Sequence, residues 1–204
     1  MPCFPDIPDP PALGGEDWQW LGSAVWRALF QRLTSDPAFE LGPPPPGALQ
    51  PAGVFVTLVH HGDLRGCLGA SVPGQEPLAE VAPRLAVASA TKDRRFGPLR
   101  PEELPGLTVE ITVLGDLVRL PSASDAILEG LQPVRHGVQV RRASRTGLLL
   151  PQVARRHEWS AVELLGQVCR KAGLEADAWR CSDTEIWAFQ AVTFSAARTG
   201  GRPP

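Results

Sequence analysis

Residues 53–69 contain two stretches that favour β-strands, separated by a turn. The first, Gly53 to Leu58, is filled with β-branched and aromatic residues and shows no helical period. His61-Gly62-Asp63 supplies turn-forming residues, and Leu64 to Leu68 is long enough to pair back as a second strand. The segment therefore predicts a β-hairpin. The sequence leaves its register open, and a shift of one residue would move every side chain of a strand to the opposite face.

The second strand of this hairpin carries a thiol close to a cationic side chain. Cys67 follows Arg65 by two residues, and residues at that spacing on a strand share a face. A nearby cation favours the thiolate and lowers the pKa of a thiol. Gly66 and Gly69 bracket Cys67, and glycine inside a strand indicates a bulge or a close backbone approach. A second interpretation is that Arg65 closes a surface salt bridge while Cys67 packs as a small hydrophobic side chain.

The composition is that of an ordinary globular protein. The 204 residues are 43% hydrophobic and 21% charged, which is enough apolar material for a substantial core. The net charge of −2 gives no electrostatic reason to expect nucleic-acid or anionic-membrane binding. No apolar run approaches the roughly 18 residues of a membrane span, and the N-terminus lacks a signal-peptide pattern. We therefore expect a cytoplasmic protein with reduced thiols.

The cysteines and histidines show no spacing typical of a metal site. His60 and His61 are adjacent at a strand end, so their side chains point to opposite faces. The chain also lacks Walker A, GxGxxG, HExxH and GxSxG signatures. The four cysteines are scattered, which argues against a zinc site or a disulfide framework: Cys3, Cys67, Cys169 and Cys181. We predict no metal and no cofactor.

Helices and strands are mixed along the rest of the chain. Residues 16–33 carry an apolar residue at every fourth position, which predicts an amphipathic helix. Leu107–Leu114 alternates cleanly and places Glu110 on the polar face of a strand. Ser160 and Glu163 have capping-box spacing at the start of a helix. Further elements are predicted as a helix over 77–91 that contains Pro83, a strand at 117–120, a helix at 122–131, a hairpin of 137–142 and 147–150, a helix from Pro151, and a strand over 185–194.

This mixture of hairpins and helices favours the α+β class over a regular βαβ array. Residues 16–196 are expected to form a single domain that can contain two lobes. The proline-rich residues 1–15 and the last residues, 197–204, are expected to be disordered tails.

Eight short motifs resemble a known family. They occur in one order: Gly53-Val-Phe-Val-Thr-Leu58, Gly62-Asp-Leu-Arg-Gly-Cys-Leu-Gly69, Pro77-Leu78, Asp93-Arg-Arg-Phe96, Val109-Glu-Ile-Thr-Val-Leu114, His136-Gly-Val138, Gly147-Leu-Leu-Leu-Pro-Gln-Val153 and Cys169-Arg-Lys-Ala-Gly-Leu174. Together they resemble the AMMECR domain family, and in particular its bacterial type, called AmmeMemoRadiSam system protein A. The resemblance runs from about Trp18 to about Phe194. It implies an antiparallel β-sheet flanked by helices with a smaller lobe, and association with Memo-like and radical SAM proteins.

Several polar residues within these motifs are candidates for one site. A thiol, an imidazole and an acid are the ingredients of nucleophilic catalysis when the base hydrogen-bonds the thiol. We predict Cys67, Glu110 and His136 as catalytic residues. The predicted substrate-binding residues are Arg65, Gly66, Thr57 and Arg95. The alternatives are that Glu110 is simply solvated and that His136 is a turn residue.

Two functions of different class fit these observations. The first is a small-molecule-binding or catalytic cleft built around the LRGC motif at Leu64–Gly69, in an enzyme or enzyme subunit that acts with Memo-like and radical SAM partners. The second is a non-catalytic module that docks a partner protein. The sequence names neither a substrate nor a reaction.

Overall fold

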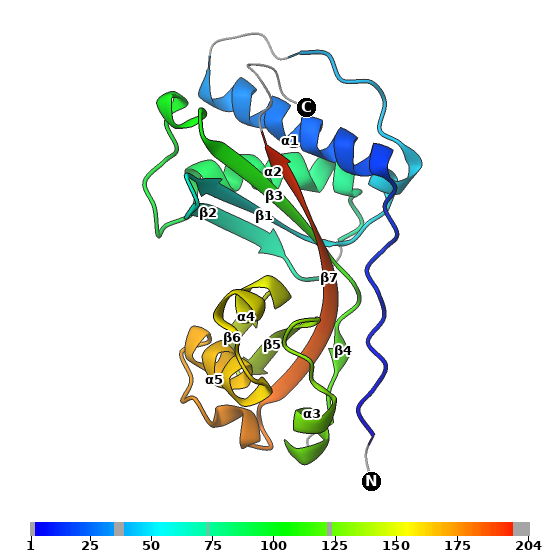
Figure 1. Ribbon diagram of the computed structural model, residues 1–204, viewed down its shortest axis with the longest axis vertical. Helices are drawn as coiled ribbons and strands as arrows, with labels where there is room; N and C mark the ends of the chain where they lie inside the picture. Colours follow the sequence, from blue (N-terminus) through cyan, green and yellow to red (C-terminus); the bar gives the residue numbers. More distant parts are fainter. Residues whose placement is uncertain (1–2, 35–38, 73, 122–123, 198–204) are drawn as a thin grey trace. The chain divides into compact units, whose positions relative to one another are not determined.

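The computed structural model describes residues 3–34, 39–72, 74–121 and 124–197. These form an α+β fold with an antiparallel sheet, as predicted (Figure 1). The chain divides into two compact units. We call Pro11–Leu114 with Val192–Pro204 the Cys67 unit, and Met1–Pro10 with Gly115–Ala191 the His136 unit.

The Cys67 unit packs two long helices on one face of a sheet. Its strands are β1 (Gly53–His60), β2 (Asp63–Ala70), β3 (Leu107–Leu114) and the end of β7 (Glu185–Ala197), in the order β2-β1-β3-β7. The helices are α1 (Gly15–Leu33) and α2 (Leu78–Thr91), with single 3₁₀ turns at Pro46–Leu49 and Pro101–Glu103. Figure 1 shows both helices on the same side of β1–β3.

Alternation along β1 separates the two faces of this sheet. Every second residue of the strand is fully buried in the core shared with the helices: Val54, Val56 and Leu58. Phe55 and Thr57 lie between them and therefore point to the opposite face. The hairpin predicted at 53–69 is confirmed as β1 and β2, and the strand predicted at Leu107–Leu114 is confirmed as β3.

The His136 unit contains the other strands and three short helices. Its strands are β4 (Val118–Arg119), β5 (His136–Arg142), β6 (Arg145–Leu149) and the first part of β7, and β7 pairs with both β4 and β5. Its helices are α3 (Ser124–Gly130), α4 (Pro151–His157) and α5 (Ala161–Lys171), with a 3₁₀ turn at Ala178–Arg180. The predicted second hairpin and the helix starting at Pro151 are both confirmed. The first two residues of the helix predicted at 122–131 lie outside the described residues.

The capping box at the start of α5 is also confirmed. The Ser160 hydroxyl accepts the Glu163 N–H at 3.3 Å, and the Glu163 carboxylate accepts the Ser160 N–H at 2.8 Å. The buried face of the helix contains Leu164, Leu165 and Val168. These backbone and side-chain bonds to Ser160 lower the pKa of Glu163.

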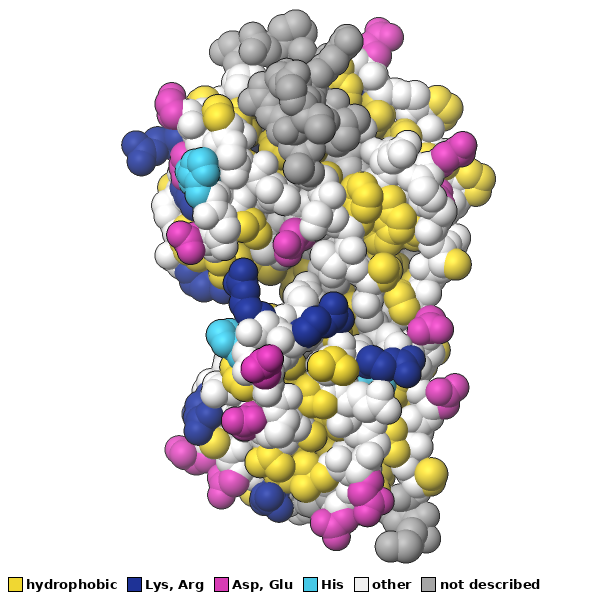
Figure 2. Space-filling model, in the orientation of Figure 1, with side chains coloured by type: hydrophobic (Ala, Val, Ile, Leu, Met, Phe, Trp, Pro, Cys, Tyr) yellow, Lys and Arg dark blue, Asp and Glu magenta, His cyan; other side chains and the backbone are white. Residues whose placement is uncertain are grey.

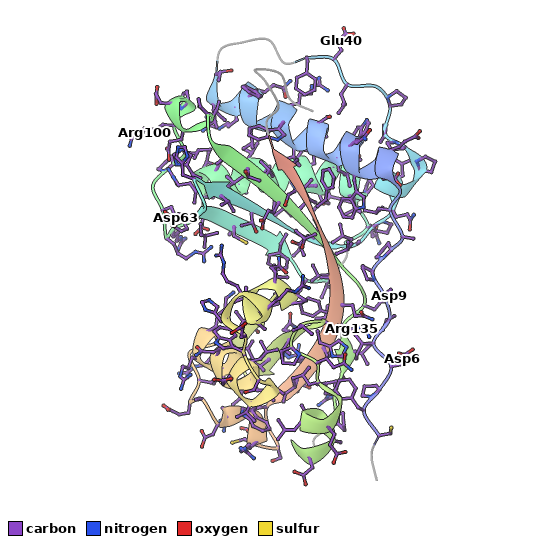
Figure 3. The ribbon with its side chains drawn as sticks, in the orientation of Figure 1. Asp6, Asp9, Glu40, Asp63, Arg100 and Arg135 are labelled. Carbon is purple, nitrogen blue, oxygen red and sulfur yellow. The ribbon has the colours of Figure 1, made fainter. Side chains whose placement is uncertain are left out.

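Two stretches differ from simple expectation. Residues 3–10 are not a loose tail: Ile7 is buried in the core of the His136 unit, and its carbonyl accepts the Gln190 side chain at 2.6 Å. Asp6 and Asp9 of the same stretch are exposed (Figure 3). The apolar residues between the prolines pack into the core although this stretch forms no helix or strand.

Pro83 lies inside α2 and does not end the helix.

Candidate functional site

Cys67, Thr57 and Glu110 form one row across three strands of the Cys67 unit. Thr57 on the central strand β1 pairs with Cys67 of β2 on one side and with Glu110 of β3 on the other. Directly opposed residues of antiparallel strands point to the same face. At a strand spacing of about 4.8 Å, the Cα atoms of Cys67 and Glu110 are roughly 10 Å apart. The register therefore places thiol, hydroxyl and carboxylate together on the sheet face opposite α1 and α2.

A hydrogen bond joins the first two members of this row. The Thr57 hydroxyl donates to Cys67 Sγ at 3.2 Å, and Thr57 itself is only 9% exposed. Cys67 and Glu110 are both half-buried. Within the part of the chain that the structure describes, the Glu110 carboxylate has no hydrogen bond or ion pair. A half-buried carboxylate without a protein partner is available to accept hydrogen bonds from a ligand.

Arg65 and Cys67 do not follow the regular alternation of a strand that the two-residue spacing assumes. The β1–β2 register passes from Leu58–Gly66 to Val59–Leu64, so Arg65 is the extra residue of a β-bulge. Its guanidinium binds both carboxylate oxygens of Glu103, at 2.6 and 3.0 Å, and lowers the pKa of that carboxyl.

Arg65 also fastens the segment that follows α2. Its two Nη atoms donate to the carbonyls of Gly97 and Pro98 at 2.9 and 3.1 Å. Arg100 of the same segment is 80% exposed and points away from the sheet (Figure 3). With four of its five N–H donors occupied, Arg65 positions this segment. Its role in substrate binding stays a prediction.

A second clamp holds the backbone of Cys67 from outside the edge of the sheet. The Asp93 carboxylate accepts the Cys67 N–H at 2.9 Å, while Arg95 Nη2 donates to the Cys67 carbonyl at 3.3 Å. Arg95 binds Asp93 through Nε and Nη2 at 3.0 and 2.7 Å, which holds the pKa of Asp93 well below its ordinary range. Asp93 and Arg95 therefore anchor the segment after α2 to the edge of the sheet.

Arg95 keeps part of its guanidinium free. Its side chain is 53% exposed and lies over the Phe96 ring. Among the described residues, Arg95 Nη1 makes no hydrogen bond. The hydrogen-bonded Asp93 carboxylate raises the pKa of Arg95, and the nearby Cys67 adds a smaller contribution in the same direction. Arg95 is therefore the cation that can reach a ligand beside the thiol.

Gly66 has a packing role next to Cys67. A Cβ at this position would overlap the backbone carbonyl of Ser89 in α2. The Ser89 hydroxyl in turn accepts the Leu68 N–H at 2.9 Å and donates to the Val56 carbonyl at 2.8 Å. Glycine thus permits the close backbone approach that the sequence predicts, and Ser89 pins α2 to both strands of the hairpin.

His136 belongs to the other unit and is held there by its own contacts. It is 7% exposed, stacks on Phe4 at a centroid distance of 5.7 Å, and its Nδ1 accepts the Gln132 N–H at 3.1 Å. Burial, together with the charge of Arg135, lowers its pKa. A neutral ring whose Nδ1 accepts carries its proton on Nε2. In this state neither nitrogen is free to take a proton from a thiol, so we leave His136 out of the proposed site.

The remaining thiols and charges lie outside this row. Cys169 is buried, and burial raises the pKa of its thiol, whereas Cys3 and Cys181 are exposed. Across the described residues, no group of three His, Cys, Asp or Glu side chains is placed to hold a metal ion. On the face drawn in Figure 2, acidic and basic side chains are interspersed. No helix in the described ranges is long and apolar enough to cross a membrane.

Two residues of this site were missed by the sequence analysis. Glu103, the partner of Arg65, lies 38 residues away in a loop, and no local pattern marks it. Ser89 lies on an alanine-rich helix where a serine carries no special signal. Asp93 was noted only as the first residue of the Asp93-Arg-Arg-Phe96 motif, without a role of its own.

Comparisons with known proteins show the family to which the chain belongs. The AMMECR1 family model matches residues 23–194, and the chain belongs to this family. A protein of Methanopyrus kandleri is 38% identical over 183 residues, which cover 88% of each chain. A protein of Methanothermobacter thermautotrophicus is 43% identical over 148 residues, covering 71% of this chain and 76% of that protein. The crystal structure of an uncharacterised protein from Pyrococcus horikoshii is similar with a TM-score of 0.82 and 33% identity, covering 89% of this chain and 92% of that one.

Proposed function

We propose that the protein is a cysteine-dependent enzyme, or enzyme subunit, that binds a small molecule on the sheet face formed by Cys67, Thr57 and Glu110. The observation that carries the proposal is the Thr57 hydroxyl donating to Cys67 Sγ at 3.2 Å. The Glu110 carboxylate lies in the same row and has no partner among the described residues. A cysteine that only fills space needs neither a hydroxyl donor nor a clamped backbone.

Each member of the site has a separate task in this proposal. The Thr57 O–H stabilises negative charge on the sulfur, because hydrogen bonds to charged acceptors are stronger than neutral ones. Glu110 accepts a hydrogen bond from the ligand, or takes the thiol proton through a bridging water. Arg95 Nη1 binds an anionic group of the ligand. Arg65 and Asp93 act as positioning residues, since they hold the loop and the backbone around Cys67.

The family resemblance extends this proposal to partners and compartment. The bacterial subtype implies that the protein acts with a Memo-like protein and a radical SAM protein, and we include both as proposed partners. A working thiol must stay reduced, which fits the cytoplasm.

Thiol reactivity tests the role of Thr57. Full-length protein is treated with limiting iodoacetamide, and the adducts are mapped by peptide mass spectrometry. We expect Cys67 to be modified before Cys169 and Cys181. Thr57→Val should slow modification of Cys67 about fivefold, since the lost hydrogen bond contributes about 1 kcal/mol and 1.4 kcal/mol corresponds to tenfold. Thr57→Ser keeps the hydroxyl and serves as the matched control. Preferential modification of Cys169 or Cys181, or equal rates for Thr57→Val and Thr57→Ser, contradicts the proposal.

Ligand retention tests the small-molecule site itself. Immobilised wild-type protein, Cys67→Ala and Glu110→Gln are incubated with the same metabolite extract, and the retained molecules are identified by mass spectrometry. We expect a molecule that the wild type retains and that both variants lose. If all three proteins retain the same molecules, the site does not bind a small molecule, and the result favours the alternative of a non-catalytic module that docks a partner protein.

A further inference from the structure

A pocket of about 310 Å³ lies on the helical side of the Cys67 unit, away from the Cys67 row. Its floor is one face of α1, where residues spaced by three and four positions line up: Trp20, Ala24, Arg27, Ala28 and Gln31. Leu41 and Gly42 form one side, and Ala79 and Pro83 of α2 form the other. The volume is at the lower end of the range of about 300–1,000 Å³ found for small-molecule sites.

Arg27 is the charged group of this pocket and lacks a counterpart. Its Nε is buried and has no hydrogen-bond partner among the residues that the structure describes. None of the described lining residues is an aspartate or a glutamate, and no ion pair of Arg27 occurs in the described ranges. A buried donor that has no acceptor is unfavourable. The described lining therefore offers no anionic partner for Arg27, and a carboxylate matches the guanidinium in geometry and charge.

The walls around Arg27 are mostly apolar. The Trp20 indole N–H donates to the Gly42 carbonyl at 2.8 Å, so its polar atom is already satisfied and the ring presents an apolar surface. The same bond fastens residues 41 and 42 to α1. Leu41, Pro83 and the alanines complete the apolar lining. A ligand that fits must therefore combine one anionic group with a hydrocarbon body.

Pro83 adds one acceptor to the pocket. Proline carries no N–H, so the carbonyl of Ala79, four residues earlier, lacks its usual helical donor. Ala79 and Pro83 both line the pocket. A hydroxyl or amino group next to the carboxylate of a ligand could donate to this carbonyl. The proline inside α2 would thus contribute a free carbonyl to the binding site, in addition to removing one hydrogen bond from the helix.

We propose that this pocket binds a small organic carboxylate with an apolar body, with Arg27 holding the carboxylate and Trp20, Leu41 and Pro83 covering the hydrocarbon part. The site is separate from the Cys67 row, because α1 and α2 pack on the opposite face of the sheet. It is therefore a second binding site, and it does not depend on the proposed function of Cys67.

Nuclear magnetic resonance of the full chain tests the proposal with hexanoate as the probe. Hexanoate should shift the Arg27 Nε–H and Trp20 Nε1–H signals saturably. The neutral isostere hexanamide should bind at least tenfold more weakly, since it cannot form the charged pair. Arg27→Gln should weaken hexanoate binding at least tenfold. Arg32→Gln removes an exposed arginine of the same helix outside the lining, and should change the affinity less than twofold. Adding a hydroxyl, in 2-hydroxyhexanoate, should tighten binding.

Several results would overturn the assignment. These are the absence of saturable shifts at millimolar hexanoate, equal affinity for hexanamide, unchanged binding by Arg27→Gln, or shifts confined to other residues. Tighter binding of inorganic phosphate than of hexanoate would show that the pocket is not a carboxylate site. If circular dichroism shows that Arg27→Gln does not fold, the comparison of hexanoate with hexanamide on the wild-type protein decides the question.

Discussion

Replacing Asp93 with asparagine tests whether the clamp on Cys67 stabilises the Cys67 unit. Asp93 Oδ2 accepts the Cys67 N–H at 2.9 Å and Arg95 Nη2 at 2.7 Å, while Oδ1 accepts Arg95 Nε at 3.0 Å. Asparagine keeps the shape but turns one oxygen into a donor. Either the Cys67 N–H or the Arg95 Nε–H then faces a donor instead of an acceptor.

The expected cost at pH 7 is about 2 kcal/mol. A hydrogen bond to a charged group contributes about 1.5–3 kcal/mol. The Arg95 side chain is 53% exposed, so water replaces part of the hydrogen bonding that it loses in the variant. The contribution of the Arg95–Asp93 pair to the free energy of unfolding is therefore smaller than that of a buried pair. Asp93 itself is 7% exposed, so water replaces little of what its carboxylate loses. Urea denaturation monitored by tryptophan fluorescence measures the free energy of unfolding of both proteins.

The pH dependence provides an independent check on the same charge. Arg95, with the N–H groups of Cys67 and Arg95, holds the pKa of Asp93 below the value of about 3.9 typical of an unfolded chain. As the pH falls below about 5, the unfolded chain therefore binds the proton first, and the stabilisation by Asp93 is progressively lost. Asp93→Asn has no carboxyl to titrate there. The difference between wild type and variant should shrink between pH 5 and pH 2.

Local dynamics and a matched control complete this test. The amide proton of Cys67 should exchange faster in Asp93→Asn than in the wild type. Arg94→Gln changes an exposed neighbour for which the structure shows no ion pair, and should alter stability by less than about 0.5 kcal/mol. A cost of Asp93→Asn below about 0.5 kcal/mol at pH 7, or a difference that stays constant down to pH 2, would refute the reasoning.

Three further substitutions probe packing and capping by the same denaturation assay. Leu165→Ala should cost about 2–5 kcal/mol, because Leu165 is fully buried and its removal leaves a cavity. Ser160→Ala should cost about 1 kcal/mol through loss of the α5 cap, and equally mild effects at both positions would show that the helix is not docked as described. Gly66→Ala should cost about 1–3 kcal/mol, since the new methyl group meets the rigid carbonyl of Ser89; a neutral result would mean that α2 can move away.

Local patterns in the sequence determined most of the elements. Alternation at Leu107–Leu114 identified β3, and the capping box at Ser160 identified the start of α5. The glycines around Cys67 indicated a bulge or a close backbone approach, and the structure contains a bulge at Arg65 and a close approach at Gly66. Such features are visible because they depend on residues a few positions apart, where the periods of strand and helix and the conformational range of glycine apply directly.

Only the tertiary structure decided which side chains meet. The β1 register puts Thr57 between Cys67 and Glu110, and a slip of one residue would have separated them. Glu103 takes the charge of Arg65 across 38 positions of chain, and Ile7, which lies among the N-terminal prolines that predict disorder, fills a core built from segments distant in the sequence. These outcomes depend on shape and charge complementarity between distant segments. They cannot be predicted from local composition, because the sequence of one segment does not specify which distant segment it contacts.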